Sequence, residues 1–167
     1  MMPPYHFLAQ QLREEWDNLE RVIRLAQRSV VGAKRHPEDQ DIYIGSAALN
    51  LHGFYSGVEK MFLSIAEQID DSIPTGARWH IALLNQMTYD LPTIRPPVLS
   101  PVTRDALHEY RSFRHLVRNV YTYHIDPAKV EALVDRLRDV WAAVKQDLER
   151  FLAFLDAVAQ AEVEENR

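Results

Sequence analysis

Apolar residues recur at helical spacing along most of the chain. Three long segments, residues 5–35, 42–69 and 127–160, place apolar side chains three and four positions apart, as on one face of an α-helix. Two shorter segments, residues 77–89 and 101 to about 120–123, show the same pattern. Alternating runs of β-branched residues are scarce. The pattern therefore predicts an all-α fold, an antiparallel bundle of four to five helices.

Polar breaks and capping signals separate these segments. The stretches AKRHPEDQD (33–41), DDSIPTG (70–76) and the proline-rich LPTIRPPVLSP (91–101) interrupt the helical pattern. Ser100-Pro101 and Asp126-Pro127 each combine a good N-cap residue with proline at the first helical position. These two dipeptides predict the starts of the last two helices.

The length and the net charge of the chain indicate a single acidic domain. At 167 residues the chain is long enough for a single hydrophobic core, so we expect one helical domain over residues 1–160 and an acidic tail, 161–167, that frays. The net charge of −5 argues against a protein that coats nucleic acid by bulk attraction, so any anion site must be local. With no cysteine, no targeting segment and no apolar stretch near the length of a membrane span, we expect a soluble cytoplasmic protein that does not bind membranes.

Positive groups gather in one segment of this acidic chain, FRHLVRNVYTYHIDP (113–127). On a helical wheel His108, Arg111, His115 and Arg118 share one side of the fourth helix. The adjoining side is apolar and is expected to face the core: Tyr110, Phe113, Val117, Val120 and Tyr121. The basic stripe is either a solvated helix face or part of a site.

His124 lies where the chain must turn from the fourth helix into the fifth. Because the helix is expected to end after Arg118, the imidazole and the guanidinium can converge on one point. The N-terminus of the next helix would lie close by and would offer unpaired N–H groups. The three together predict a phosphate site. The alternative is a histidine that only bonds a terminal carbonyl of the preceding helix.

Other candidate groups are weaker. His52 and His80 lie on apolar helices and are expected to be hydrogen-bonded packing residues. No spacing of His, Asp or Glu assembles three or four metal ligands, so no metal or other cofactor is expected. Gly53 and Gly57, four positions apart on the second helix, would allow a neighbouring backbone to approach closely.

The run Arg118-Asn119 followed by His124 resembles the motif of the HEPN superfamily, and of the HepT-like toxins in particular. The family motif is an arginine late in a helix, often followed by a polar residue, and a histidine at the next break of a small bundle. The segments LHGFYSGVEKMFLSIAEQID, PTGARWHIALLNQM and FRHLVRNVY also look like the HepT-like branch. The resemblance covers residues 45–155.

The resemblance implies a metal-independent endoribonuclease toxin that works as a homodimer. Arg118, Asn119 and His124 would be catalytic, and Arg111, Arg114 and His115 would bind the RNA backbone. The partner would be a cognate minimal nucleotidyltransferase, which neutralises the toxin by adding AMP to a tyrosine. We expect RNA cleavage in EDTA and its loss in the variant His124→Ala.

The chain departs from the family at one position. Many HepT-like proteins carry the AMP-accepting tyrosine two residues after the histidine, and here that residue is Asp126. Tyr121 and Tyr123 lie within the motif and are the alternative acceptors. A second hypothesis is a non-catalytic HEPN module that binds a nucleotide or docks on a nucleotidyltransferase. In either case the glycine-bearing second helix or the basic fourth helix could form the dimer interface.

Overall fold

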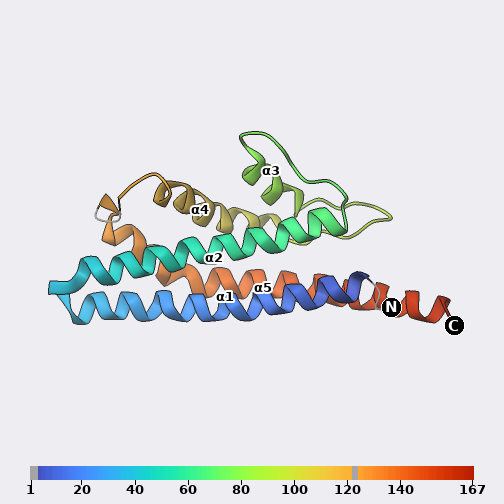
Figure 1. Ribbon diagram of the computed structural model, residues 1–167, viewed down its shortest axis with the longest axis horizontal. Coiled ribbons are helices and arrows are strands. Elements are labelled where there is room, and N and C mark those ends of the chain that lie inside the picture. Colours follow the sequence, from blue (N-terminus) through green and yellow to red (C-terminus); the bar gives the residue numbers. More distant parts are fainter. Residues whose placement is uncertain (1–3, 122–123) are drawn as a thin grey trace.

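A computed structural model describes residues 4–121 and 124–167 and confirms the all-α bundle. The described residues form five α-helices (Figure 1). These are α1 (Pro4–Arg35), α2 (Gln40–Gln68), α3 (Trp79–Gln86), α4 (Pro101–Val117) and α5 (Pro127–Glu165), with a short 3₁₀ helix, η1 (Pro37–Asp39), between α1 and α2.

The helix α2 is the centre of the bundle. The long helices α1, α2 and α5 run along one another, and α3 and α4 lie on the side of α2 away from α1 (Figure 1). Helix α2 packs against each of the other four α-helices. It is therefore the element through which the short helices are joined to the long ones.

Aromatic rings link four helices in the core. Phe54 of α2 meets Tyr110 of α4 edge-to-face at 5.5 Å between ring centroids, and meets Trp141 of α5 at 6.1 Å. Trp16 of α1 contacts Trp141 at 5.6 Å. Such pairs contribute about 0.5–1.5 kcal/mol each beyond the area that they bury. The cluster holds the position of α4 relative to the long helices.

Gly57 allows α1 to lie close against α2. A Cβ atom at this position would come within 2.5 Å of Leu19 Cδ2, which is a buried side chain of α1. At Gly53 a Cβ would meet only Val22, at an ordinary 3.8 Å. The side of α2 that carries Gly57 is therefore covered by α1 within the same chain.

We predict that Gly57→Ala destabilises the protein by about 1–3 kcal/mol, because a methyl group must be forced against Leu19 in a packed core. The matched variant Gly53→Ala has room for its methyl group and gains up to about 1 kcal/mol in helix propensity. Urea unfolding of the two variants measures the difference. Equal midpoints would contradict this account of the α1–α2 contact.

A buried ion pair organises the segment between α2 and α4. Nε and Nη2 of Arg95 donate to the two carboxylate oxygens of Asp70 at 2.6 and 2.8 Å. Its Nη1 and Nη2 atoms also donate to the carbonyl oxygens of Tyr89, Pro96 and Gln86 at 3.0, 3.1 and 3.1 Å. The side chains of Arg95 and Asp70 are 0% and 2% exposed. The proline-rich stretch 91–101 was predicted to be an extended connector. In the structure it is folded around the guanidinium group of Arg95.

Both predicted N-caps are confirmed. The Ser100 hydroxyl accepts a hydrogen bond from the N–H of Thr103, and the Asp126 carboxylate accepts one from the N–H of Ala128. At the other end of the chain α5 continues to Glu165, and fraying of residues 161–167 stays a prediction. Within the described residues, no helix combines the length and the apolar character that crossing a membrane requires.

Helix α4 ends earlier than predicted, at Val117 instead of 120–123. Asn119 accounts for this end, because its side-chain Nδ2 donates to the carbonyl oxygen of His115 at 2.9 Å and its backbone N–H donates to that of Leu116. Asparagine side chains compete in this way with helix continuation. The prediction that Tyr121 faces the core is wrong, since its side chain is 71% exposed beyond the helix end.

Candidate functional site

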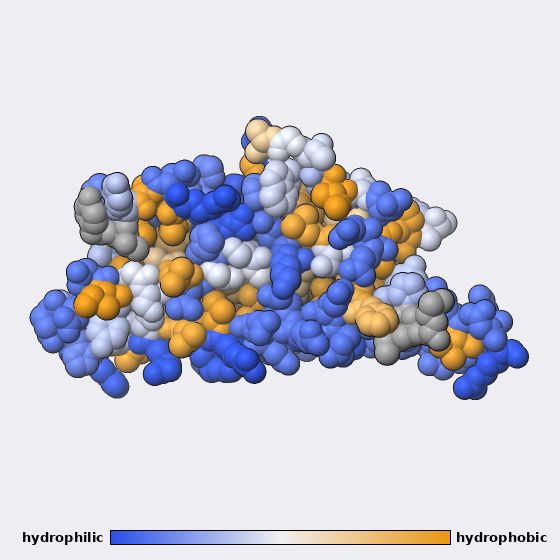
Figure 2. Space-filling model, viewed as in Figure 1, coloured by the Kyte–Doolittle hydropathy of each residue, from blue (hydrophilic) through white to orange (hydrophobic). Residues whose placement is uncertain are grey.

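The last two turns of α4 and the start of α3 enclose a small hollow of about 20 Å³. It is large enough for one water molecule or for one oxygen of a phosphate group. Strongly hydrophilic residues cover this region of α4 in the space-filling view (Figure 2). The lining residues are three arginines and two histidines: His80, Arg111, Arg114, His115 and Arg118.

A buried carboxylate lies behind the hollow. Glu59 of α2 is only 5% exposed, and its two oxygens are bound by groups from two other helices. Nδ1 of His80 lies 2.6 Å from Oε2, and Nη1 of Arg114 donates to Oε1 at 2.8 Å. The guanidinium of Arg114 also lies 5.6 Å from the ring centroid of Tyr55. Glu59 thus ties α3 and α4 to α2 at this site.

Arg114 has a different environment from the one expected of an RNA-binding residue. Its side chain is 10% exposed and is paired with Glu59, so most of the guanidinium faces the protein interior. Burial and the nearby Glu59 carboxylate together raise the pKa of Tyr55, which keeps that phenol protonated. The described contacts make Arg114 the counter-ion of Glu59, although Arg114 also lines the hollow.

Arg118 is exposed at the end of α4 and adds its charge to the hollow. It is the C-cap residue, where a cation also interacts favourably with the helix dipole. The positive charge of Arg118 also affects a histidine on the neighbouring helix α2. Burial, and then the positive charges of Arg114 and Arg118, lower the pKa of His52 on α2, so this histidine is neutral at neutral pH. Arg111 and His115 complete the polar lining.

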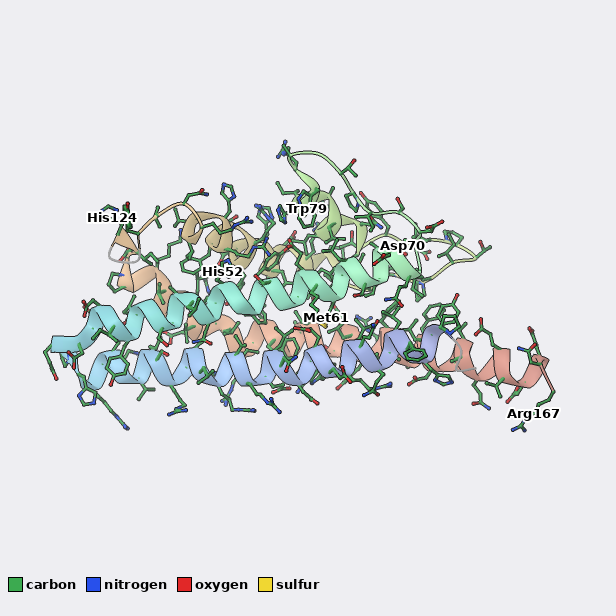
Figure 3. The ribbon with its side chains drawn as sticks, in the orientation of Figure 1. His52, Met61, Asp70, Trp79, His124 and Arg167 are labelled. Atoms are coloured by element: carbon green, nitrogen blue, oxygen red, sulfur yellow. The ribbon has the colours of Figure 1, made fainter. Side chains whose placement is uncertain are left out.

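His124 lies in the connection between α4 and α5, outside the residues that line the hollow. Its backbone N–H donates to the carbonyl oxygen of Tyr121 at 3.0 Å, and the rings of the two residues approach edge-to-face at 6.2 Å. Figure 3 shows His124 well away from Trp79, the neighbour of His80. Convergence of His124 with Arg118 stays a prediction. The alternative AMP acceptor Tyr123 lies outside the described residues.

Asn119, expected to help in catalysis, is exposed beside Arg118. Its Nδ2 group is engaged in the hydrogen bond to the carbonyl oxygen of His115 that ends α4. The structure therefore brings together Arg111, His115 and Arg118 from the predicted site, with Arg114 beneath them. Asn119 lies at the margin of this group.

Two residues of this arrangement, Glu59 and His80, were not predicted as site residues. Neither has a short-range sequence signal, because their contact joins residues 21 positions apart and the contact with Arg114 spans 55 positions. The one local feature is the Trp79-His80 pair, whose rings lie 3.6 Å apart. Only the packing of α3 and α4 on α2 brings these residues to one place.

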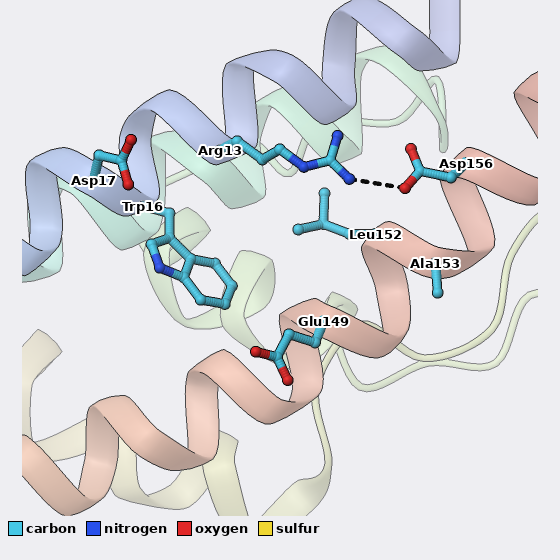
Figure 4. Close-up of a pocket in the computed structure, with 7 residues that line it drawn as sticks. All are labelled: Arg13, Trp16, Asp17, Glu149, Leu152, Ala153 and Asp156. Atoms are coloured by element: carbon cyan, nitrogen blue, oxygen red, sulfur yellow. Dashed lines mark hydrogen bonds and ion pairs between the residues drawn. The ribbon is translucent and has the colours of Figure 1, made fainter.

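A larger groove, of about 490 Å³, lies between α1 and α5 (Figure 4). Trp16 lines it, and the ion pair between Arg13 and Asp156, at 2.8 Å, crosses it. Its other charged lining residues, Asp17 and Glu149, are acidic. The groove would therefore repel a phosphate, and the hollow at α4 is the better anion site. In the described part of the chain, no group of three or more His, Cys, Asp or Glu side chains is arranged to hold a metal ion.

The family comparison agrees with this fold. The model of a family described as HepT-like protein matches residues 46–155, which is more than half of the chain and runs from α2 into α5. The chain therefore belongs to the HepT-like family, consistent with a place in the HEPN superfamily. Comparisons with curated proteins and with solved structures found no match.

Proposed function

We propose that this HepT-like protein is the toxin of a toxin–antitoxin pair and acts as a metal-independent endoribonuclease. The observation that carries the proposal is the cationic hollow at the exposed end of α4, where Arg111 and Arg118 face the same space as two imidazoles. A local site of this kind is what an acidic protein needs in order to hold a phosphodiester.

The residues fit the chemistry of RNA cleavage. Attack of the 2′-hydroxyl on the adjacent phosphorus needs proton transfer, and imidazole is suited to this near neutral pH. It also needs stabilisation of the negative charge on the pentacoordinate phosphorus, and Arg118 can supply that by bidentate contact. The Arg-x5-His spacing assigns the proton transfer to His124, with Asn119 orienting it. Arg111 and His115 would bind the neighbouring backbone.

Partners follow from the same proposal. Two copies would form a homodimer in which the two motifs face a shared cleft. A cognate minimal nucleotidyltransferase would be the antitoxin and would transfer AMP to a tyrosine near the motif. Tyr121 supports this step, because its exposed side chain lies beside His124. Tyr123 is the second candidate acceptor. The reaction takes place in the cytoplasm in this proposal.

The decisive experiment is incubation of the purified protein with single-stranded RNA in the presence of EDTA. We expect fragments ending in a 2′,3′-cyclic phosphate, because the attacking group is the adjacent 2′-hydroxyl. The variant Arg118→Ala, purified in parallel, reports any contaminating nuclease. Intact RNA after prolonged incubation with the wild-type homodimer would rule the proposal out.

The position of His124 favours a second candidate function. A hollow lined by arginines can bind a phosphate without any proton transfer, and His124 does not line it. In that case the protein is a HEPN module that binds a nucleotide or docks on a nucleotidyltransferase. Calorimetry would then show nucleotide binding that Arg118→Ala abolishes, while no RNA is cut.

A further inference from the structure

A second group of cations lies on the C-terminal half of α1. Residues 21–37 contain five Lys or Arg and no Asp or Glu, in a chain that has 24 acidic and 19 basic residues. Arg24, Arg28 and Arg35 lie along one stripe of this helix, four and seven positions apart. We propose that this α1 arginine stripe binds the backbone of single-stranded RNA. The inference rests on the proposed function and adds a second RNA contact to it.

The α1 arginine stripe borders a pocket of about 430 Å³ beside the turn between α1 and α2. Besides the three arginines, His36 and Tyr43 line this pocket, and its other lining residues are uncharged. The groove between α1 and α5 differs, because Asp17, Glu149 and Asp156 line it. The pocket at the α1 arginine stripe has no acidic lining residue and is therefore suited to an anion.

The three arginines are exposed and form no ion pair with a carboxylate in the described part of the chain. Arg35 lies in the last turn of α1, where a cation stabilises the helix dipole. Arg24 and Arg28 lie about three and two turns before that end, beyond the range of this effect. As like charges four positions apart they also repel each other. Exposed cations spaced along one stripe can neutralise successive phosphates of a nucleic acid.

His36 and Tyr43 add aromatic surface to the pocket. Their rings lie nearly parallel, with 17° between the ring planes and 5.7 Å between the centroids. The ring of Tyr43 is held against α1, since a Cβ at Gly32 would come within 2.4 Å of it. The side chain of His36 is 51% exposed, so part of its ring is accessible to a base. Stacking of bases on such rings, together with cations along the backbone, is how proteins bind single-stranded RNA without reading its sequence.

The position of the pocket along the bundle fits one RNA strand that also reaches the motif. Helices α1 and α5 are antiparallel neighbours (Figure 1), as the ion pairs Arg13–Asp156 and Lys145–Glu20 show. The C-terminal half of α1 is therefore level with the first turns of α5, which follow His124 closely in the chain. Packed helices lie about 8–10 Å apart. A strand of several nucleotides can therefore extend from the α4–α5 connection to the α1 arginine stripe.

The RNA affinity of the double variant Arg24→Gln, Arg28→Gln tests the proposal. Glutamine removes both charges and is as good a helix former as arginine. The probe is a fluorescent single-stranded RNA of about 12 nucleotides whose 2′-hydroxyls are methylated, so that the proposed reaction cannot cleave it. We expect affinity to fall about tenfold and the slope of log affinity against log salt to become shallower by about 1.4, because each phosphate contact on a single strand contributes about 0.7. In cleavage assays the loss should appear in KM.

The double variant Arg13→Gln, Arg104→Gln is the matched control. It removes the same number of positive charges, but these two arginines are paired with Asp156 and Asp105. Its RNA affinity and its salt slope should equal those of the wild-type protein. A fluorescent polyglutamate peptide of similar length serves as a second probe, because it carries negative charge without bases. We expect the wild-type protein to bind it about tenfold more weakly than the RNA.

The outcomes separate this inference from the proposed function. Wild-type RNA affinity in Arg24→Gln, Arg28→Gln would overturn the inference and leave the proposed ribonuclease standing. Equal losses in this variant and in the control would also overturn the inference, because net charge alone would then explain them. Tighter binding of polyglutamate than of RNA would overturn it in favour of an acidic protein surface. Absence of RNA cleavage by the wild-type protein would overturn the proposed function, whereas the affinity measurements would still decide whether α1 binds RNA.

Discussion

Replacing Asp70 by alanine is expected to destabilise the protein by about 3–5 kcal/mol, because it leaves the guanidinium of Arg95 buried without a counter-ion. Both side chains are almost fully enclosed, and Arg95 also organises three backbone carbonyls of its segment. The loss should appear as a large fall in the urea midpoint and in Tm. Because the segment joins α2 to α4, we also expect weaker protection of α3 from amide hydrogen exchange.

The exposed ion pair between Arg13 and Asp156 provides the control for this prediction. Its side chains are 45% and 47% exposed, so solvent screens the interaction. The variant Asp156→Ala should change stability by no more than about 1 kcal/mol. If Asp70→Ala and Asp156→Ala lose similar amounts of stability, the buried ion pair between Asp70 and Arg95 does not stabilise the segment between α2 and α4.

The second large effect is expected for Arg118→Ala, which should lower the rate of RNA cleavage by about 10²–10³-fold. The guanidinium is the exposed cation at the end of α4, and the proposed function uses it to stabilise charge that develops on phosphorus. Stability should hardly change, because an exposed side chain at a C-cap contributes little to packing. Single-turnover cleavage measures the chemical step and avoids effects of product release.

Arg118→Lys refines this test. Lysine keeps the charge and loses the two parallel donors, so its rate should lie between those of the wild-type protein and the alanine variant. If the alanine variant cleaves at the wild-type rate, the phosphate does not bind at Arg118. That result would contradict both the proposed ribonuclease activity and the alternative function as a nucleotide-binding module, because each uses Arg118 to hold a phosphate.

The helices could be predicted because their signals are local. The spacing of apolar residues in α1, α2 and α5 and the capping residues Ser100 and Asp126 act within a few positions of one another. These are interactions that a single sequence displays. The end of α4 was missed because the side chain of Asn119 competes with the helix, and apolar periodicity does not register that competition.

The buried polar groups could not be predicted, because each depends on a distant partner. Arg95 looked like a charge in a proline-rich connector, and its contacts with Asp70 span 25 positions. Arg114 was expected to bind the RNA backbone, whereas its side chain is paired with Glu59 on another helix. In both cases the packing of the helices decides which charges are buried, and only the assembled bundle shows it.

The contact between Trp79 and His80 gives the candidate site an optical reporter. Indole emission depends on the groups in contact with the ring, and the centroids of the Trp79 and His80 rings lie 3.6 Å apart. The other two tryptophans, Trp16 and Trp141, contact each other in the core, so replacing both by phenylalanine would leave Trp79 as the single tryptophan. Its emission would respond to changes beside the Trp79 ring, such as the arrival of a phosphate at the hollow, without any added label.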